Sequence, residues 1–393
     1  MMRLDSSWVR MGLVAGLVVL LTGLSAAGGP DPPGESAASL QVPSAARLRI
    51  GTTFSSKQCL YLGIPWKETY LKVLSLEPDI LRLGAYWDQI EEEPGEYRFE
   101  ELDWQIAHAR RRKVPVLLTV GMKAPRWPEY HLPPWVRERI HVPRGQDISQ
   151  DAFLRGRTLA FIRAVVERYR DEPIIQFWQV ENEPMDRSGP ADWWIGPEFL
   201  EAQADLIREL DPSARPIVIN TLAAPNPLLR FLRRWVMRND PVEAAIRLAN
   251  IVAVNVYPII GHRFLGCGMY FVTKPEERVR HVAGIADAVQ ESGRPLWVTE
   301  LQAEPWEPGH LAYQGRGEPL TGRPEQLRPY FKELTDQEIQ TVFLWGCEYW
   351  YYRKLRMDDP SWWKEVASLL EELREARGKL KEELERSIAP PAV

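Results

Sequence analysis

The chain alternates short apolar runs with longer segments whose apolar residues recur at helical spacing. Each apolar run has the length of a strand and is apolar almost throughout, which is typical of strands covered on both faces. These runs occupy residues 48–52, 79–84, 114–120, 174–180, 216–220, 251–257, 295–300 and 341–345. The pattern predicts parallel strands buried beneath helices.

The segments between the predicted strands have the apolar spacing of helices that bury one face. They lie at residues 67–77, 99–112, 151–169, 198–210, 227–239, 242–250, 276–291, 325–334 and 362–377. Regular alternation over residues 47–378 favours an α/β fold, a single (β/α)8 TIM barrel with eight parallel strands inside outer helices. A doubly wound open sheet is the alternative, but no glycine-rich turn follows the first predicted strand.

The amino terminus has the features of a targeting segment. Within residues 1–27, Arg3 and Arg10 precede an apolar run at 11–24, and small residues follow it. The run is short for a membrane span, so a cleaved signal peptide is favoured over an uncleaved N-terminal anchor. We therefore expect the folded domain to be secreted or otherwise outside the cytoplasm, with membrane contact only through an uncleaved N-terminal segment.

Two further segments flank the predicted domain at 47–378. Residues 28–46 are rich in Gly, Pro, Ser and Ala and are expected to form a flexible linker. Residues 379–393 begin with a highly charged stretch, which predicts a solvated helical extension followed by a tail.

Composition narrows the possible functions. Apolar residues make up 45% and charged residues 26% of the 393 residues, as in ordinary globular proteins, and the net charge of −5 does not suggest a nucleic-acid partner. The sequence contains no CxxC, HExxH, GxSxG or GxxxxGK[ST] motif, so it supports no metal, serine-hydrolase or phosphate-binding chemistry. Cys59, Cys267 and Cys347 are expected on one side of the barrel, where a disulfide from Cys59 and free thiols both remain open.

Two of the predicted strands lead into a glutamate. The run 174–180 is followed by Glu181-Asn182-Glu183-Pro184, and proline cannot continue a strand ladder. The run 295–300 ends in Glu300. Because the carboxyl ends of barrel strands meet at one mouth, Glu183 and Glu300 are expected to face each other. Paired carboxyl groups across a sugar bond perform glycoside hydrolysis.

Other chemically capable residues fall at the same strand ends. Arg82 lies in the second predicted strand, where a structural ion pair is the alternative to a place in the site. Asn255 and Tyr257 end the sixth strand on one face, and Trp345 ends the eighth. The aromatic residues that follow strand ends are Trp87, Trp127, Trp306 and Tyr349, of which at least one or two should line a sugar-binding cleft. Trp87 and Trp127 are the two expected to bind the substrate.

These motifs resemble those of the retaining glycoside hydrolases of the (β/α)8 superfamily known as clan A, which includes cellulase-like, β-galactosidase-like and β-xylosidase-like families. The resemblance covers residues 47–378. Its most specific pieces are Asn182-Glu183-Pro184 and Thr299-Glu300, and the stretches 82–87 and 94–103 are also similar to what those families carry around their second strand.

The resemblance implies that Glu183 is the general acid/base and Glu300 the nucleophile. It further implies that Asn182 bonds the sugar 2-hydroxyl, that Arg82 and Tyr257 keep the nucleophile ionised, and that Trp345 forms the floor beneath the sugar. Cellulase-like members often carry His where this chain has Asn255, whereas some β-galactosidase-like relatives carry Asn, which leaves the specific family and the sugar open. Glu181 is expected either to support the site by hydrogen bonding or to be structural.

The expected function is retaining hydrolysis of β-glycosidic bonds in an oligo- or polysaccharide. No cofactor and no metal are expected, because both catalytic groups are protein carboxyls. Two alternatives remain open: a catalytically silent carbohydrate-binding protein on the same barrel, and a transglycosylase that uses the same residues. The sequence contains no indication of oligomeric state.

Overall fold

The computed structural model describes residues 48–222, 240–264, 267–307, 319 and 321–388, which belong to one compact unit, Ala37–Val393. The predicted signal segment, the linker and the helix predicted at 227–239 lie outside the described residues. Among the helices that the structure describes, none has both the length and the hydropathy needed to span a bilayer.

Eight parallel strands close into a barrel, in which each strand pairs with the barrel strand that follows it along the chain. The strands are β1 (Arg49–Phe54), β2 (Ile80–Gly84), β3 (Val116–Val120), β4 (Ile175–Val180), β5 (Ile217–Leu222), β6 (Ile251–Val256), β9 (Leu296–Gln302) and β10 (Thr341–Trp345). The barrel closes where β10 pairs with β1, with Leu344 opposite Thr52. The predicted α/β fold class, a (β/α)8 barrel, is therefore confirmed.

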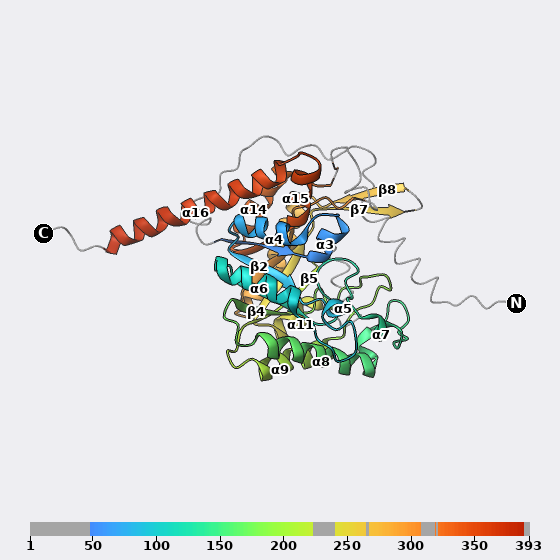
Figure 1. The fold of residues 1–393 in the computed structure, drawn as a ribbon. Helices are drawn as coiled ribbons and strands as arrows, with labels where there is room; N and C mark the ends of the chain where they lie inside the picture. The colour runs from blue at the N-terminus through green and yellow to red at the C-terminus, as the bar shows by residue number, and fades with distance from the viewer. Residues whose placement is uncertain (1–47, 223–239, 265–266, 308–318, 320, 389–393) are drawn as a thin grey trace. The chain divides into compact units, whose positions relative to one another are not determined.

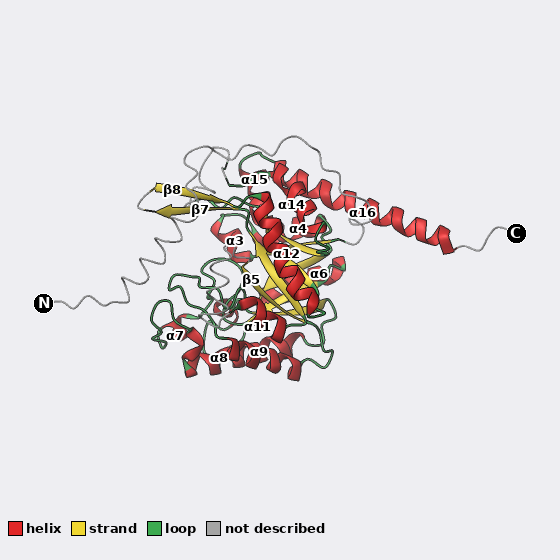
Figure 2. Cartoon of the chain, turned by 180° about the vertical axis from the view of Figure 1, so that it is seen from behind, coloured by secondary structure: helices red, strands yellow, loops and turns green. Residues whose placement is uncertain are grey.

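Helices lie outside these strands (Figures 1 and 2). The main ones are α4 (Trp66–Ser75), α6 (Glu100–Arg112), α8 (Ala152–Tyr169), α9 (Pro197–Leu210), α11 (Pro241–Leu248), α12 (Pro275–Glu291), α14 (Leu327–Thr335) and α16 (Ser361–Ile388). Each matches a helix predicted from the apolar spacing, apart from small differences at the ends. The last helix, α16, continues through the charged stretch that begins at residue 379.

The elements that the apolar spacing did not predict lie mostly in the loops that follow the strands. They are α3 (Ser56–Tyr61), α5 (Trp87–Ile90), α7 (Pro134–Arg137), the 3-10 turns η1 (Ile148–Gln150) and η3 (Pro324–Gln326), the hairpin β7 (Ile259–Phe264)–β8 (Cys267–Val272), and α15 (Cys347–Arg356). Most of these helices are too short to show a helical period in sequence. They enlarge the carboxyl-terminal side of the barrel, where TIM-barrel active sites lie.

The interior of the barrel is a packed core rather than a channel. A cluster of inward-facing side chains, which includes Leu117, Trp297 and Phe343, fills it, with Phe177 packed alongside. The Arg49 guanidinium lies over the Trp297 ring, 5.1 Å from its centroid, at the start of β1. Since side chains fill the amino-terminal part of the barrel, a substrate has access only from the opposite end.

Two of the three cysteines carry free, buried thiols. Cys59 and Cys347 form no disulfide, and burial raises the pKa of both thiols well above the ordinary value for cysteine. The side chain of Cys267 lies outside the described part of the structure.

Candidate active site

Glu300 is held by two donors from two other strands. Arg82, fully buried on β2, places Nη1 2.6 Å from Glu300 Oε1. The Tyr257 hydroxyl, just past β6, donates to Oε2 at 2.5 Å. A carboxylate bonded to a guanidinium and a hydroxyl is stabilised in its charged form. Burial, followed by the charge of Glu300, raises the pKa of Tyr257 well above its usual value, so the phenol remains a donor.

At Glu183, three residues after the end of β4, the chain turns away from the direction of the strand. The φ of Glu183 is +44°, an uncommon conformation for a residue with a side chain. Its backbone N–H donates to Asn220 Oδ1 at 2.7 Å, and its carbonyl accepts from Lys123 Nζ at 2.6 Å. Asn255 Nδ2 donates to the carboxyl atom Oε1 at 2.8 Å. The surroundings on β3, β5 and β6 therefore fix both the turn and the side chain.

Glu183 and Glu300 are of one residue type but lie in different surroundings. Burial raises the pKa of Glu183 to about 8, and the negative charge of Glu300 adds to this effect. No arginine bonds to Glu183 among the described residues, whereas Arg82 bonds directly to Glu300. Glu183 is thus suited to hold a proton at neutral pH, whereas Glu300 is bonded to a cation and a hydroxyl donor.

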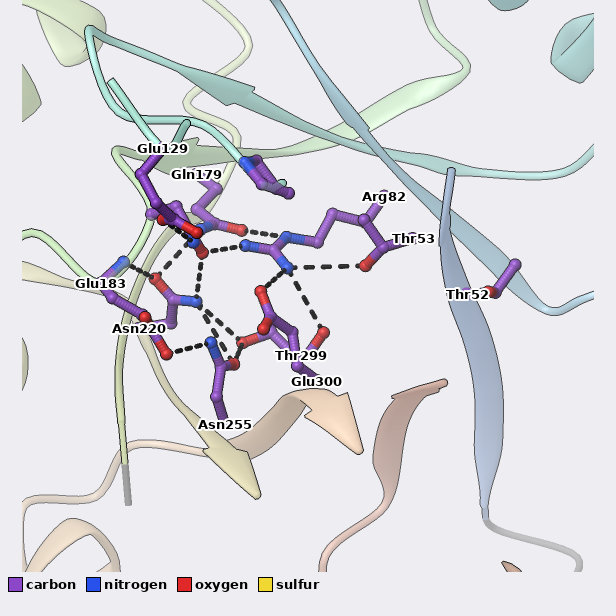
Figure 3. Close-up of polar contacts among 12 residues, drawn as sticks. Thr52, Thr53, Arg82, Glu129, Gln179, Glu183, Asn220, Asn255, Thr299 and Glu300 are labelled. Atoms are coloured by element: carbon purple, nitrogen blue, oxygen red, sulfur yellow. Dashed lines mark hydrogen bonds and ion pairs between the residues drawn. The ribbon is translucent and has the colours of Figure 1, made fainter. Parts of the chain in front are cut away.

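A network of amide side chains joins the two glutamates (Figure 3). Asn182 Oδ1 accepts from Arg82 Nη2 at 2.5 Å and from Asn220 Nδ2 at 3.0 Å. Thr299 Oγ1 donates to Asn255 Oδ1 at 2.7 Å, on the other side of the same network. The structure thus brings together residues from β2, β4, β5, β6 and β9.

Two members of this network were not singled out from the sequence. Asn220, in β5, bonds to Asn182, Glu183 and Thr299. Gln179, in β4, accepts from Arg82 Nε at 2.7 Å. Asn220 ends the predicted strand 216–220, so the strand-end rule that selected Glu300 applies to it as well. Gln179 lies inside an apolar run and carries no such signal.

A third carboxyl group lies beside this network and was also missed. Glu129, in the loop after β3, accepts a hydrogen bond on Oε2 from Asn182 Nδ2 at 3.3 Å. Burial, with the charge of Glu300 adding and Lys123 opposing, raises the pKa of Glu129 to about 7. Glu129 does not lie at the end of a strand, so the strand pattern gives no reason to select it.

Trp345 ends β10, as predicted, and is half-buried. One face of its ring is covered by the Arg126 guanidinium, which lies 3.9 Å from the ring centroid. Arg126 is itself held by Glu304 and by Glu348, which accepts at 2.5 Å. Arg126 therefore covers one of the two ring faces on which a sugar could stack.

The other aromatic candidates separate into two pairs. Trp87 and Tyr349 are completely buried, and the Trp87 ring stacks on Phe161 at 5.3 Å while its N–H donates to Glu91. Trp87, expected to bind substrate, is instead part of the core, because α5 turns its side chain inward. Trp127 is 68% exposed and Trp306 40% exposed, and both remain open to a ligand.

Trp306 is the exposed ring placed directly at the site. It packs edge-on against Tyr257, with ring centroids 4.8 Å apart. Tyr257 bonds the nucleophile candidate Glu300, so only the Tyr257 ring separates Trp306 from that glutamate.

Glu181 supports the site from below. Its carboxyl is fully buried, accepts the Lys123 backbone N–H at 2.6 Å and lies against the backbone of Gly121. Burial raises its pKa to about 8. Lys123 in turn binds the Glu183 carbonyl, so Glu181 positions the loop that holds Glu183.

The described residues contain no group of three His, Cys, Asp or Glu side chains arranged to hold a metal ion. A groove of about 700 Å³ lies elsewhere, between α8 and α9, and none of the residues described above lines it.

Comparison with known proteins shows what part of this chain is similar to. The family model Glyco_hydro_42, described as "Beta-galactosidase", matches residues 65–194, a range that includes Asn182 and Glu183. The curated rice (Oryza sativa subsp. japonica) protein "Mannan endo-1,4-beta-mannosidase 7" is 26% identical over 127 residues, which cover 29% of this chain and 32% of that protein. The match thus spans about a third of the curated relative's length.

Solved structures show the same fold. The β-galactosidase from the psychrophilic Marinomonas ef1 matches with a TM-score of 0.58 at 15% identity, and the match covers 85% of this chain and 60% of that chain. Xylanase 10B from Thermotoga maritima matches with a TM-score of 0.52 at 15% identity, and the match covers 85% of this chain and 98% of that chain. Together with the family model and the curated relative, this shared fold confirms the resemblance to the (β/α)8 glycoside hydrolases.

Proposed function

We propose that this protein is a retaining β-glycosidase that cleaves an oligo- or polysaccharide by double displacement. The observation that carries the proposal is the contrast between its two glutamates. Glu300 is bonded to Arg82 and Tyr257, whereas burial and the Glu300 charge raise the pKa of Glu183 to about 8. A nucleophile must be ionised and a general acid protonated, and the two surroundings meet these needs.

The proposed reaction has two steps, and neither needs a cofactor. First, a Glu300 carboxylate oxygen attacks the anomeric carbon while Glu183 gives its proton to the departing glycosidic oxygen. Second, the ionised Glu183 removes a proton from water, whose oxygen attacks the anomeric carbon and releases Glu300. The sugar leaves with its original configuration, and both glutamates regain their starting states.

Substrate contacts follow from the same arrangement. Asn182, which is held by Arg82 and Asn220, is proposed to bond the sugar 2-hydroxyl, and Asn255 keeps the acid in place. The Trp345 ring face that Arg126 does not cover is proposed as the floor, and the exposed rings of Trp127 and Trp306 offer further stacking surfaces. The relatives are named for galactosidase, β-mannosidase and xylanase activities, which supports a neutral β-linked sugar.

A panel of activated aryl β-glycosides tests the proposal. Glu300→Ala should lower kcat by at least about 1,000-fold, because the attacking group is lost. Azide should partly restore turnover and give a glycosyl azide of inverted configuration. In Glu183→Ala, azide should instead give a product of retained configuration, because Glu300 still forms the intermediate. The exposed Glu277→Ala on α12 serves as the matched control.

Three outcomes would change the proposal. Full activity in Glu300→Ala would refute the assignment of the nucleophile. Sugar binding without turnover across the whole panel would indicate a carbohydrate-binding protein. Transfer to added acceptor sugars in preference to water would indicate a transglycosylase.

We further propose that the folded domain acts outside the cytoplasm, on the basis of the basic, apolar and small-residue pattern of residues 1–27. Expression of the full chain followed by intact-mass measurement of the exported protein tests this. Retention of all the protein in the cytoplasm would contradict it, and an exported, membrane-bound form of full mass would indicate an anchor.

A further inference from the structure

The turn between Arg126 and Glu129 presents a carboxyl group that the two-step mechanism does not use. Arg126 has φ +84° and Glu129 has φ +72°, both in the region that residues with side chains rarely adopt. The turn is closed by hydrogen bonds from Glu129 N to Arg126 O at 2.9 Å and from Ala124 N to Glu129 O at 3.0 Å. Backbone strain of this kind concentrates at functional sites.

This turn directs the Glu129 carboxyl toward the side chain of Asn182. Within the described part of the chain, Asn182 Nδ2 at 3.3 Å is the only donor to that carboxyl. An ionised carboxylate has about four acceptor positions, so most of its capacity remains for a ligand. The side chain is also only half-buried, like Glu183 and Tyr257 of the same mouth.

A purely structural explanation does not account for Glu129. Lys123 is the cation that most opposes the rise in the pKa of Glu129, but its ammonium donates to the carbonyls of Glu183 at 2.6 Å and Asp186 at 3.1 Å. No salt bridge joins Lys123 to Glu129 among the described residues. Asn182 does not need Glu129 for its position either, because Arg82 and Asn220 already hold its Oδ1.

We propose that Glu129 is a substrate-binding residue whose carboxylate accepts a hydrogen bond from a hydroxyl group of the sugar unit that Asn182 contacts. This inference rests on the proposed glycosidase function and narrows its substrate to sugars with a free hydroxyl donor at that position. A charged acceptor makes the stronger type of hydrogen bond, and a site built around such a bond rejects analogues that lack the hydroxyl.

Glu129→Gln, which keeps the shape and removes the charge, tests the proposal. kcat/KM is measured on a parent aryl glycoside and on its 2-deoxy, 3-deoxy and 4-deoxy analogues. We expect a loss of about 10- to 100-fold on the parent, but less than about 3-fold on the one analogue that lacks the bonded hydroxyl. Glu138→Gln, an exposed glutamate nine residues further along, makes the same charge change and should alter none of these values.

An equal loss on every substrate would overturn the proposal, because Glu129 would then act only by positioning Asn182. An unchanged kcat/KM on the parent would overturn it as well. If the glutamine variant fails to fold, as judged by its circular dichroism, Glu129→Asp keeps the charge and should show the same selective pattern with a smaller loss.

The failure of this inference can be distinguished from the failure of the proposed function. Wild-type turnover with no selective effect in Glu129→Gln rejects only the inference. If the wild type hydrolyses no glycoside, calorimetric binding of the parent glycoside and its deoxy analogues to wild type and Glu129→Gln replaces the kinetics. A selective loss of affinity would then support the contact, and equal affinities would reject it.

Discussion

At the scale of single residues, the environment of each carboxyl decides what it can do. Glu300 has a guanidinium and a hydroxyl on its two oxygens, whereas Glu183 has one amide donor and a charged neighbour. Moving a carboxyl out of water favours its neutral form, and a nearby negative charge does the same. Glu183 can therefore keep its proton at neutral pH.

The pH dependence of activity follows from this difference. Because the proposed mechanism needs the proton on Glu183, whose pKa is raised to about 8, kcat/KM should fall as the pH rises through about 8. With an aryl glycoside whose leaving group needs no acid, Glu183→Ala should lose this alkaline limb. Steady-state profiles between pH 5 and 10 check the prediction, and an alkaline limb that persists in the variant would contradict it.

At the scale of elements, the loops after the strands hold the site together. The stretch after β3 places Lys123 under the Glu183 carbonyl, Arg126 on Trp345 and Glu129 beside Asn182. Its start depends on Gly121, which has φ +125° and packs against the Glu181 carboxyl. One loop therefore contacts the acid candidate Glu183 and the ring of Trp345, and it also carries the third carboxyl group, that of Glu129.

Gly121→Ala tests the importance of this packing. A Cβ at residue 121 would lie 2.3 Å from Glu181 Cδ, in a conformation that only glycine adopts easily. We expect a loss of about 2–4 kcal/mol in the free energy of unfolding, and reduced kcat in the protein that remains folded.

Urea unfolding of Gly121→Ala gives the measurement, and Gly378→Ala provides the matched control. Gly378 lies on α16 with open space around its Cα. Its replacement by alanine should stabilise the protein by about 0.5–1 kcal/mol. Equal stability of wild type and Gly121→Ala would show that the loop adjusts to the added methyl group.

At the scale of the whole barrel, the two ends of the domain must meet for the site to exist. Closure of β10 against β1 brings Trp345 beside a site whose other members come from β2 to β9. The last helix adds a second connection, because Arg377 on α16 binds both oxygens of Asp79 at 2.6 Å and the carbonyl of Leu48. This contact ties the end of the domain to its first two strands.

Arg377→Ala should therefore destabilise the barrel without changing its chemistry. We expect a loss of about 1–3 kcal/mol in the free energy of unfolding, because a bidentate ion pair is removed while Asp79 remains half-buried. The kcat of the folded protein should be unchanged, since the contact lies away from the site residues. Glu375→Ala, two residues earlier and exposed, should stay within about 0.5 kcal/mol of wild type in the same urea experiment.

Some site residues could be predicted because their position follows from a local rule. Asn182, Glu183, Asn255 and Glu300 lie at or next to the ends of apolar strands, and barrel geometry brings such ends together. Residues in loops had no such rule. Glu129 is missed for this reason, and the expected sugar contact of Trp87 is wrong because the short helix α5 buries its ring.

The amino-acid sequence by itself determined the alternation of strands and helices, because apolar spacing is a local property that each segment expresses independently. It also determined which strand ends carry acids and amides. Only the tertiary structure decided which carboxyl is bonded to Arg82, which aromatic rings remain exposed, and that Glu129 joins the site. These features depend on the distance between side chains far apart along the chain, and closure of the barrel sets that distance.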